Sequence, residues 1–334
     1  MMNFEHKTVF SFHKKITFLA DEFDMFPQNG LILAAVSGGP DSMCLLNALL
    51  AISSKRGFKV VAAHFNHKLR GDEANRDEAF VIEECKNRNV ELVVDFADVK
   101  AYSDEKGIGI VEAARDCRYE FLTKTALKLG SEHKNDNVRI ATAHNADDLA
   151  ETLIINMLRG AGALGLSSIP PVRDSIIRPM LHVSRDEIME YIKLKKINYV
   201  EDSTNKSTNQ TRNKIRHRIM PIIHEINPNF TESAIKTSQL LHKDDEYLQY
   251  LADHFIELNT DFFHQYMLNA NALNCLPYPI ASRVIKRMSS KLTYRHINDI
   301  INLCKYGKTR AYLSLPGMTV QKENDKLIFF SLSY

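Results

Sequence analysis

The sequence predicts an α/β fold, a doubly wound parallel sheet followed by a smaller C-terminal α+β domain. Three observations support this prediction. Short apolar runs alternate with helix-length segments through the first two-thirds of the chain, a glycine-containing loop follows the first run, and the last third changes to long helices and a short alternating tail. Strands separated by helices are joined by βαβ crossovers, which produce a parallel sheet with ligand sites at the carboxyl ends of its strands.

Four buried strands and four helices account for the alternation. The strands are expected at residues 31–36, 60–65, 91–96 and 138–143, and the helices at residues 41–51, 72–88, 111–129 and 147–159. Further along, Ser184 and Glu187 have the spacing of a capping box, which starts a helix that runs to about Lys196. We therefore expect functional residues directly after the first, second and fourth strands, where loops lead into helices.

The predicted domain boundary lies after residue 216, which gives a catalytic domain over 1–216 and an accessory domain over 217–334. Residues 200–217 are polar and poor in strand-forming side chains. Beyond them, residues 230–258 and 294–304 are expected to be helical. The tail then alternates apolar and polar residues around a turn at residues 323–325, which predicts a small β-hairpin.

The composition excludes several kinds of site. The five cysteines lie at positions 44, 85, 117, 275 and 304 and form no Cys-x-x-Cys pair, which argues against a disulfide framework, a zinc ribbon and an iron–sulfur site. The N-terminal residues contain no apolar core of signal-peptide length, and the longest near-apolar stretch is too short to span a bilayer. We expect a soluble, cytoplasmic protein with no membrane partner.

A phosphate-binding loop is expected immediately after the first strand. The loop reads Ser37-Gly38-Gly39-Pro40-Asp41-Ser42. Its glycines allow the backbone to approach a phosphate closely, and the free N–H groups of the following helix, with two hydroxyls, can hold an anion. The kinase-type phosphate loop requires a lysine, which this loop lacks.

The loop resembles the PP-loop of the N-type ATP pyrophosphatases, and further motifs resemble those of the tRNA(Ile)-lysidine synthetases. These motifs are His64-Phe-Asn66-His67-Lys-Leu69-Arg70, Glu112-Ala-Ala-Arg115-Asp-Cys-Arg118-Tyr119, His144-Asn-Ala-Asp147-Asp148-Leu-Ala-Glu151, Glu201-Asp202-Ser-Thr-Asn205 and Arg212-Asn213-Lys-Ile-Arg216. The resemblance implies a Rossmann-like PP-loop ATPase that joins L-lysine to carbon 2 of the wobble cytidine of the tRNA(Ile) with a CAU anticodon. The implied intermediate is an adenylated cytidine, and the products include AMP and pyrophosphate.

The resemblance also implies roles for individual residues. Residues Ser37 to Ser42 and His64 are expected to bind ATP, Asp41, Arg115 and His144 to be catalytic, and Asp148 and Glu151 to hold the ammonium group of lysine. ATP and Mg²⁺ are the expected cofactors, with Asp41 and Asp147 as candidate metal-related residues. On a helix, His144, Asp148 and Glu151 share one face. Two simpler interpretations stay open: the acids complement the helix dipole, and His64 bonds only to the backbone.

Basic side chains predict where tRNA binds. Residues 206–218 contain five basic residues and no acid, and residues 283–310 contain eight basic residues against one acid, with tyrosines interleaved. The candidate tRNA-binding residues are Arg70, Arg212, Arg216, Arg283, Lys286, Arg287, Arg295, Lys308 and Arg310. The alternative is neutralisation within the chain, because residues 217–282 carry eight acids against three bases. Homodimerisation is a further option.

Two other functions fit the same loop. A PP-loop enzyme that thiolates tRNA would need a reactive cysteine, for which Cys44 and Cys117 are the candidates. A tRNA-binding module with a relic nucleotide fold would need no intact site, and the complete phosphate loop, the acid pair and Arg115 argue against it.

Overall fold

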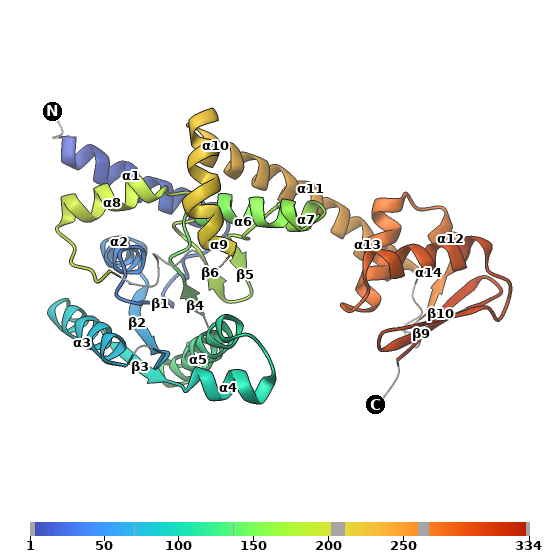
Figure 1. The fold of residues 1–334 in the computed structure, drawn as a ribbon, viewed down its shortest axis with the longest axis horizontal. Coiled ribbons are helices and arrows are strands. Elements are labelled where there is room, and N and C mark those ends of the chain that lie inside the picture. Colours follow the sequence, from blue (N-terminus) through green and yellow to red (C-terminus); the bar gives the residue numbers. More distant parts are fainter. Residues whose placement is uncertain (1–3, 70, 136, 202–210, 260–266, 332–334) are drawn as a thin grey trace. The chain divides into compact units, whose positions relative to one another are not determined.

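The computed structural model describes residues 4–69, 71–135, 137–201, 211–259 and 267–331. The chain divides into two compact units, Met1–Ser238 and Gln239–Tyr334. Figure 1 shows the elements of each unit, which are described below unit by unit. None of the helices within these ranges combines the length and the apolar character needed to cross a membrane.

The first unit is built on a six-stranded sheet of order β3-β2-β1-β4-β6-β5. All neighbours pair in parallel except β5 and β6, which pair antiparallel. The strands are β1 (Leu31–Ala35), β2 (Lys59–Asn66), β3 (Leu92–Phe96), β4 (Val138–Ala141), β5 (Val172–Arg173) and β6 (Ile176–Ile177). This order confirms the doubly wound parallel sheet, because the chain moves outward from β1 in one direction and then in the other.

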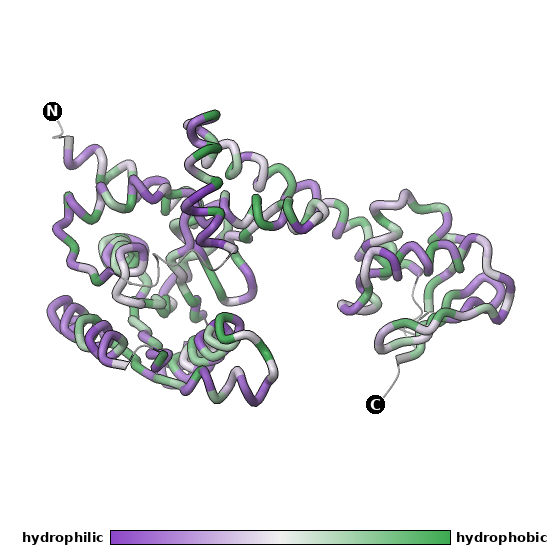
Figure 2. Tube along the Cα trace, viewed as in Figure 1, coloured by the Kyte–Doolittle hydropathy of each residue, from purple (hydrophilic) through white to green (hydrophobic). Residues whose placement is uncertain are grey.

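Helices cover both faces of this sheet. They are α1 (Phe4–Glu22), α2 (Pro40–Arg56), α3 (Asp72–Asn87), α4 (Val99–Lys106), α5 (Ile110–His133), α6 (Ala146–Leu158), α7 (Ala163–Leu166), α8 (Arg185–Lys195), α9 (Thr211–Lys214), the π-helical turn η2 (Ile215–Ile219), α10 (Met220–Ile226) and the start of α11 (Phe230–Asn259). Figure 2 shows that α3 is mostly hydrophilic, as a helix with one buried stripe should be.

Alternation along the central strands sorts side chains to the two faces. In β1, Ile32 and Ala34 belong to the core formed with α1, α2, α3 and α8, whereas Leu31 and Leu33 belong to the core formed with α5. Successive side chains of a strand point to opposite faces, so a strand buried on both faces is apolar throughout. Because β1 pairs in parallel with β2 and with β4, the carboxyl ends of these three strands lie at one edge of the sheet, and a helix follows each of them (Figure 1).

The division between the units falls inside α11, later than the boundary predicted after residue 216. Ile215 and Met220 are buried in the core of the first unit, and Ala234 near the start of α11 is buried there as well. The first unit therefore extends past the predicted boundary, because these apolar side chains on both sides of residue 216 pack onto the first core. Helices α1 and α4 and the short β5–β6 pair were not among the predicted elements.

The described residues of the second unit form an antiparallel sheet of order β7-β10-β9-β8, the end of α11 and three further helices. Its elements are the end of α11, β7 (Met267–Asn269), α12 (Ala270–Asn274), α13 (Tyr278–Met288), α14 (Tyr294–Tyr306), β8 (Tyr312–Leu315), β9 (Met318–Glu323) and β10 (Lys326–Ser331). Val320 and Phe329 from the sheet are buried with Ile300 of α14 in one core. The predicted tail hairpin is formed by β9 and β10, and the α+β character of the unit is confirmed.

Candidate active site

The loop after β1 is held by its own two hydroxyl side chains. The Ser42 hydroxyl donates to the Gly39 carbonyl at 2.9 Å and accepts the backbone N–H of Ser37 at 3.1 Å. Gly39 is the N-cap of α2 and offers no side-chain cap, and Pro40 occupies the first turn. The first N–H groups of a helix have no intrahelical acceptor, so this end of α2 is suited to an anion.

Gly38 is required by the backbone of this loop. Its φ is +87°, and a Cβ built there would lie 2.9 Å from Val200 Cγ2. Its carbonyl also accepts the backbone N–H of Val200 at 3.0 Å. The left-handed backbone and the close packing both disfavour a side chain at this position, and the hydrogen bond to Val200 joins the loop to the segment that follows α8.

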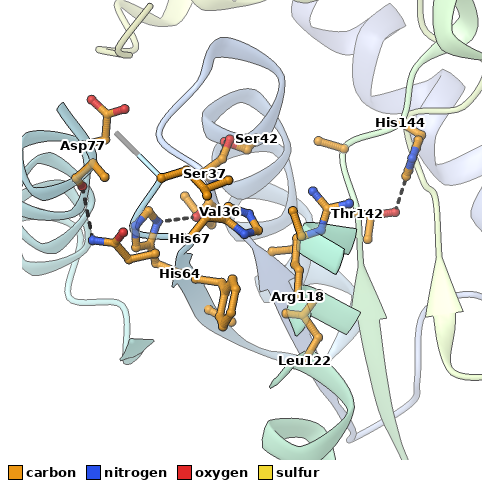
Figure 3. A pocket seen from close by; sticks show the side chains of 18 of the residues that line it. Val36, Ser37, Ser42, His64, His67, Asp77, Arg118, Leu122, Thr142 and His144 are labelled. Carbon is orange, nitrogen blue, oxygen red and sulfur yellow. Dashed lines mark hydrogen bonds between the residues drawn. The ribbon is translucent and has the colours of Figure 1, made fainter. Parts of the chain in front are cut away.

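Two cavities adjoin the loop, and Ser37, Ser42 and Ala143 line both. The first cavity, of about 330 Å³, lies at the ends of β1, β2 and β4 (Figure 3). Its walls include apolar residues and the polar side chains of His64, Asn66, His67, Asp77, Arg118, Thr142, His144 and Asp148. The second cavity, of about 590 Å³, is lined by charged and titratable side chains, namely Asp41, Asp147, Glu151, Arg185, Arg216, His217 and His224.

Both predicted site histidines line the first cavity in their neutral forms. His64 is buried and its Nδ1 lies 2.8 Å from the Val36 carbonyl, and burial lowers its pKa. His144 Nδ1 lies 3.0 Å from Thr142 Oγ1, and desolvation lowers the pKa of His144 to about 4. At neutral pH these rings add hydrogen-bonding groups to the cavity but no positive charge. The backbone contact expected as a simpler interpretation of His64 is present.

Asp148 and Glu151 lie together on α6 and bind two arginines that follow residue 210. Glu151, which is 2% exposed, accepts from Arg212 Nε at 2.9 Å and from Arg216 Nε at 2.6 Å. Asp148 accepts from Arg212 Nη2 at 3.2 Å and from Arg216 Nη2 at 3.0 Å. The structure thus brings the predicted lysine-binding acids and two predicted tRNA-binding bases together. We call these four residues, Asp148, Glu151, Arg212 and Arg216, the acid–arginine cluster.

Asp148 also holds the start of its own helix. With Asn145 it forms a capping box, in which Asn145 Oδ1 accepts the Asp148 N–H at 3.0 Å and Asp148 Oδ2 accepts the Asn145 N–H at 3.1 Å. The interpretation of these acids as helix-terminus residues is therefore correct for Asp148, but it does not account for Glu151. A nearly inaccessible carboxylate one turn further along requires cations as partners.

Asp41 and Asp147, the candidate metal-related residues, both contact Arg185. Asp41 forms an ion pair with the Arg185 guanidinium and accepts from Asn145 Nδ2 at 3.2 Å, whereas Asp147 accepts the Arg185 backbone N–H at 2.8 Å. Mg²⁺ takes oxygen ligands, commonly one or two carboxylates completed by substrate phosphates and water. The Asp41 carboxylate beside the phosphate loop fits that requirement, whereas the Asp147 carboxylate caps α8. No group of three or more His, Cys, Asp or Glu side chains suited to a metal occurs among the described residues.

Arg118, not Arg115, lies in the cavity wall. Both arginines are on α5, and each guanidinium lies near the Tyr119 ring, at 5.5 Å for Arg115 and 5.4 Å for Arg118. Both residues are exposed, but Arg118 lines the first cavity, where Figure 3 shows it beside Thr142, whereas Arg115 lines neither cavity. The packing of α5 on the sheet sets the rotation of the helix about its axis. This rotation determines which of the two arginines reaches the cavity.

The other predicted tRNA-binding residues lie on the second unit, with one exception. Arg70 falls outside the described residues. Arg283 and Arg287 form ion pairs with Asp245 and Asp253 of α11, so neutralisation within the chain occurs at these two positions. Lys286 donates to the Ser290 carbonyl at 2.8 Å. The remaining predicted residues, Arg295, Lys308 and Arg310, are exposed.

Several cavity residues were not predicted as site residues, among them Arg118, Arg185, His217 and His224. Arg185 directly follows the predicted N-cap Ser184, but no sequence signal places that helix start beside the phosphate loop. His217 and His224 had no such signal either, because they reach the cavity through the packing of η2 and α10.

Comparisons with known proteins identify relatives of this chain. A family model described as the PP-loop domain matches residues 10–223. A tRNA(Ile)-lysidine synthase of Petrotoga mobilis is 36% identical over 326 residues, which cover 95% of this chain and 97% of that protein. One from Clostridium perfringens is 39% identical over 300 residues, which cover 87% of this chain but 62% of that protein's length.

A solved structure shares the fold. It is the U34-tRNA thiolase NcsA from Methanococcus maripaludis, determined with its 4Fe–4S cluster. The match covers 71% of this chain and 80% of that one, with a TM-score of 0.56 and 18% sequence identity.

Proposed function

The chain belongs to the PP-loop family and, within it, to the tRNA(Ile)-lysidine synthases, and from this premise we propose that it ligates L-lysine to the wobble cytidine of tRNA(Ile) with a CAU anticodon. The observation that carries the proposal is the meeting of a phosphate loop and a carboxylate pair, buried Glu151 and partly buried Asp148, in the walls of two adjacent cavities. A phosphate loop alone would suit many nucleotide-binding proteins. A carboxylate pair beside it, where phosphates would be repelled, indicates a cationic second substrate.

ATP is proposed to bind with its base in the first cavity and its phosphates on the loop. The α2 N-terminus and the hydroxyls of Ser37 and Ser42 would hold the phosphates, and Mg²⁺ beside Asp41 would neutralise part of their charge. The cytidine O2 then forms a bond to the α-phosphorus as the bond to the pyrophosphate oxygen breaks. This step leaves AMP attached at carbon 2 and releases pyrophosphate. Arg118, which lines the first cavity, is proposed to stabilise the charge that develops on the phosphate, and Arg115, one turn away on α5, is the alternative.

The acid–arginine cluster is proposed to receive lysine. The Asp148 and Glu151 carboxylates would bind an ammonium group of lysine, and Arg212 and Arg216, which now occupy these carboxylates, would turn toward its carboxylate. The amine that attacks carbon 2 must be neutral. His144 lines the first cavity together with Asp148. Desolvation lowers the pKa of His144 to about 4, so its ring is neutral, does not repel an approaching amine and can accept a hydrogen bond. The new N–C bond forms as AMP leaves with O2.

The accessory unit is proposed to contact the tRNA. Arg295, Lys308 and Arg310 are exposed there, and Tyr294, Tyr306 and Tyr312 are each at least 67% exposed. Exposed guanidinium and ammonium groups bind phosphates, and exposed aromatic rings stack on unpaired bases. Arg283 and Arg287 are weaker candidates because each already has an aspartate partner.

The thiolation alternative lacks a reactive thiol in the described site. Cys44 is fully buried on α2, and burial raises the pKa of its thiol. Desolvation also raises the pKa of Cys117. Thiolates, not thiols, are the reactive form, so both cysteines are poor sulfur carriers.

A ligation assay tests the proposal directly. The protein is mixed with ATP, radiolabelled L-lysine and a tRNA(Ile) transcript, and lysine in the tRNA and pyrophosphate in solution are both measured. We expect one pyrophosphate per lysine incorporated and no incorporation into a transcript whose wobble cytidine is replaced by uridine. Equal incorporation into both transcripts, or pyrophosphate release without lysine incorporation, would refute it. Cys44→Ala and Cys117→Ala variants that keep full ligation would separately exclude thiolation.

A further inference from the structure

The phosphate loop contains no cation of its own. Residues 37–42 include neither lysine nor arginine, although a bound triphosphate carries several negative charges. Two arginines among the described residues line the second cavity beside the loop, Arg185 and Arg216. Arg216 is held by Glu151 at 2.6 Å and by Asp148 at 3.0 Å. Arg185 is therefore the guanidinium placed nearest to the loop itself, through its ion pair with Asp41.

The fold fixes the backbone of Arg185 and leaves its side chain accessible. Arg185 is the first residue of α8, and its N–H donates to Asp147 Oδ2 at 2.8 Å. Ser184 and Glu187 close a capping box at this helix start, and Lys15 of α1 binds Glu187 at 2.6 Å. The Arg185 side chain is nevertheless 41% exposed and forms part of the cavity wall. A fixed backbone with an accessible guanidinium is the arrangement expected of a ligand-binding arginine.

We propose that Arg185 binds the terminal phosphates of ATP and retains the pyrophosphate product, exchanging the Asp41 carboxylate for phosphate oxygens. This inference rests on the proposed ATP-dependent function and adds the residue that supplies positive charge to the leaving group. The planar guanidinium can donate two parallel hydrogen bonds to a phosphate, as it can to a carboxylate. Asp41 orients Arg185 before the nucleotide arrives, and it becomes available to the metal once Arg185 has turned to phosphate.

Pyrophosphate binding, measured by titration calorimetry with the full chain and without lysine or tRNA, tests this assignment. We expect Arg185→Gln to weaken pyrophosphate binding about 10- to 100-fold, since one charge-assisted contact is worth about one to two factors of ten. Arg185→Lys should recover part of the loss, because the charge remains but the paired donors do not. Arg56→Gln is the matched control: it lies at the other end of α2 and is also paired with an aspartate, Asp21, at 2.8 Å.

Asp41→Asn distinguishes phosphate binding by Arg185 from a purely structural role. In metal-free buffer this substitution frees Arg185, so pyrophosphate should bind several-fold more tightly than to the wild type. Part of that gain is the removal of a negative charge, and this part should persist in the Asp41→Asn, Arg185→Gln double variant. The rest of the gain in affinity requires Arg185 and should be absent from the double variant, so the effects of the two substitutions should not be additive.

The outcomes separate this inference from the proposed function. Equal pyrophosphate affinity of the wild type and a folded Arg185→Gln variant, with additive effects of the Asp41 and Arg185 substitutions, would overturn the role of Arg185 even if lysine ligation proceeds. If instead Arg185-dependent pyrophosphate binding is found but no lysine is ligated, the assignment holds and the proposed function fails. Thermal unfolding of each variant shows whether it is folded.

Discussion

Replacing Glu151 by glutamine tests whether the acid–arginine cluster stabilises the first unit and binds lysine. Glutamine keeps the shape of the side chain but removes the charge that accepts three hydrogen bonds from Arg212 and Arg216, at 2.9, 2.6 and 3.0 Å. It also places an NH₂ group against two guanidinium groups, which have no acceptor to offer it. The two arginines would then share Asp148 alone.

The expected loss of stability follows from burial. Removing one partner of a fully buried ion pair costs about 3–5 kcal/mol. Here Glu151 is 2% exposed but both arginine side chains are 39% exposed, so water partly solvates the guanidinium groups left behind. We therefore expect a loss of about 2 kcal/mol, which corresponds to a fall in Tm of about 4–8 °C for a unit of this size.

Thermal unfolding and lysine binding measure the two consequences. Glu91→Gln is the control, because Glu91 pairs with Lys59 at 2.7 Å while both side chains are about half exposed. That change should cost less than about 0.5 kcal/mol. In Glu151→Gln, lysine affinity should also fall by about tenfold or more, since one charge-assisted bond is lost. A variant as stable as the Glu91 control, with unchanged lysine affinity, would show that Glu151 neither fixes the arginines nor binds substrate.

Three further predictions concern the loop and the first cavity. Gly38→Ala should destabilise the first unit by about 1–2 kcal/mol from its φ of +87° alone; adding Val200→Ala should recover only the part due to the 2.9 Å contact, as thermal unfolding would show. Arg118→Gln should lower kcat/KM for ATP more than Arg115→Gln does, and the reverse order would indicate that Arg115 is the catalytic arginine. His144, whose pKa falls from 6.5 unfolded to about 4 folded, contributes stability that is complete above pH 6.5 and is lost as the pH falls toward 4. His144→Gln should therefore flatten the fall in Tm between pH 6.5 and 4.5, and an unchanged slope would contradict this assignment.

Much of the sheet could be predicted from local sequence. Each of the first four strands begins within one residue of its predicted start, because apolar runs buried on both faces leave little freedom of placement. The Ser184–Glu187 capping box forms as its spacing indicates. The phosphate loop was predictable for the same reason: glycine and helix-start chemistry act within six neighbouring residues.

Contacts between distant segments could not be predicted. Arg185 meets Asp41 across 144 positions of sequence, and Arg212 meets Glu151 across 61. A basic run without acids looks like a nucleic-acid surface until the fold brings carboxylates to it. The choice between Arg115 and Arg118 depends on how α5 rotates against the sheet, which spacing alone leaves open. The division inside α11 depends in the same way on where Ala234 packs.

Ser37, Ser42 and Ala143 line both cavities, so a substitution at any of them should change the affinity for a ligand in either cavity. Enlarging one of these small side chains narrows both compartments, so apparent affinities for nucleotide and for amino acid should fall in step. His67 lines the first cavity alone and His224 the second alone, so a substitution at either should alter the shape of one cavity only. A ligand that spans both cavities should therefore lose affinity with either histidine substitution, whereas a ligand confined to one cavity should respond to only one of the two.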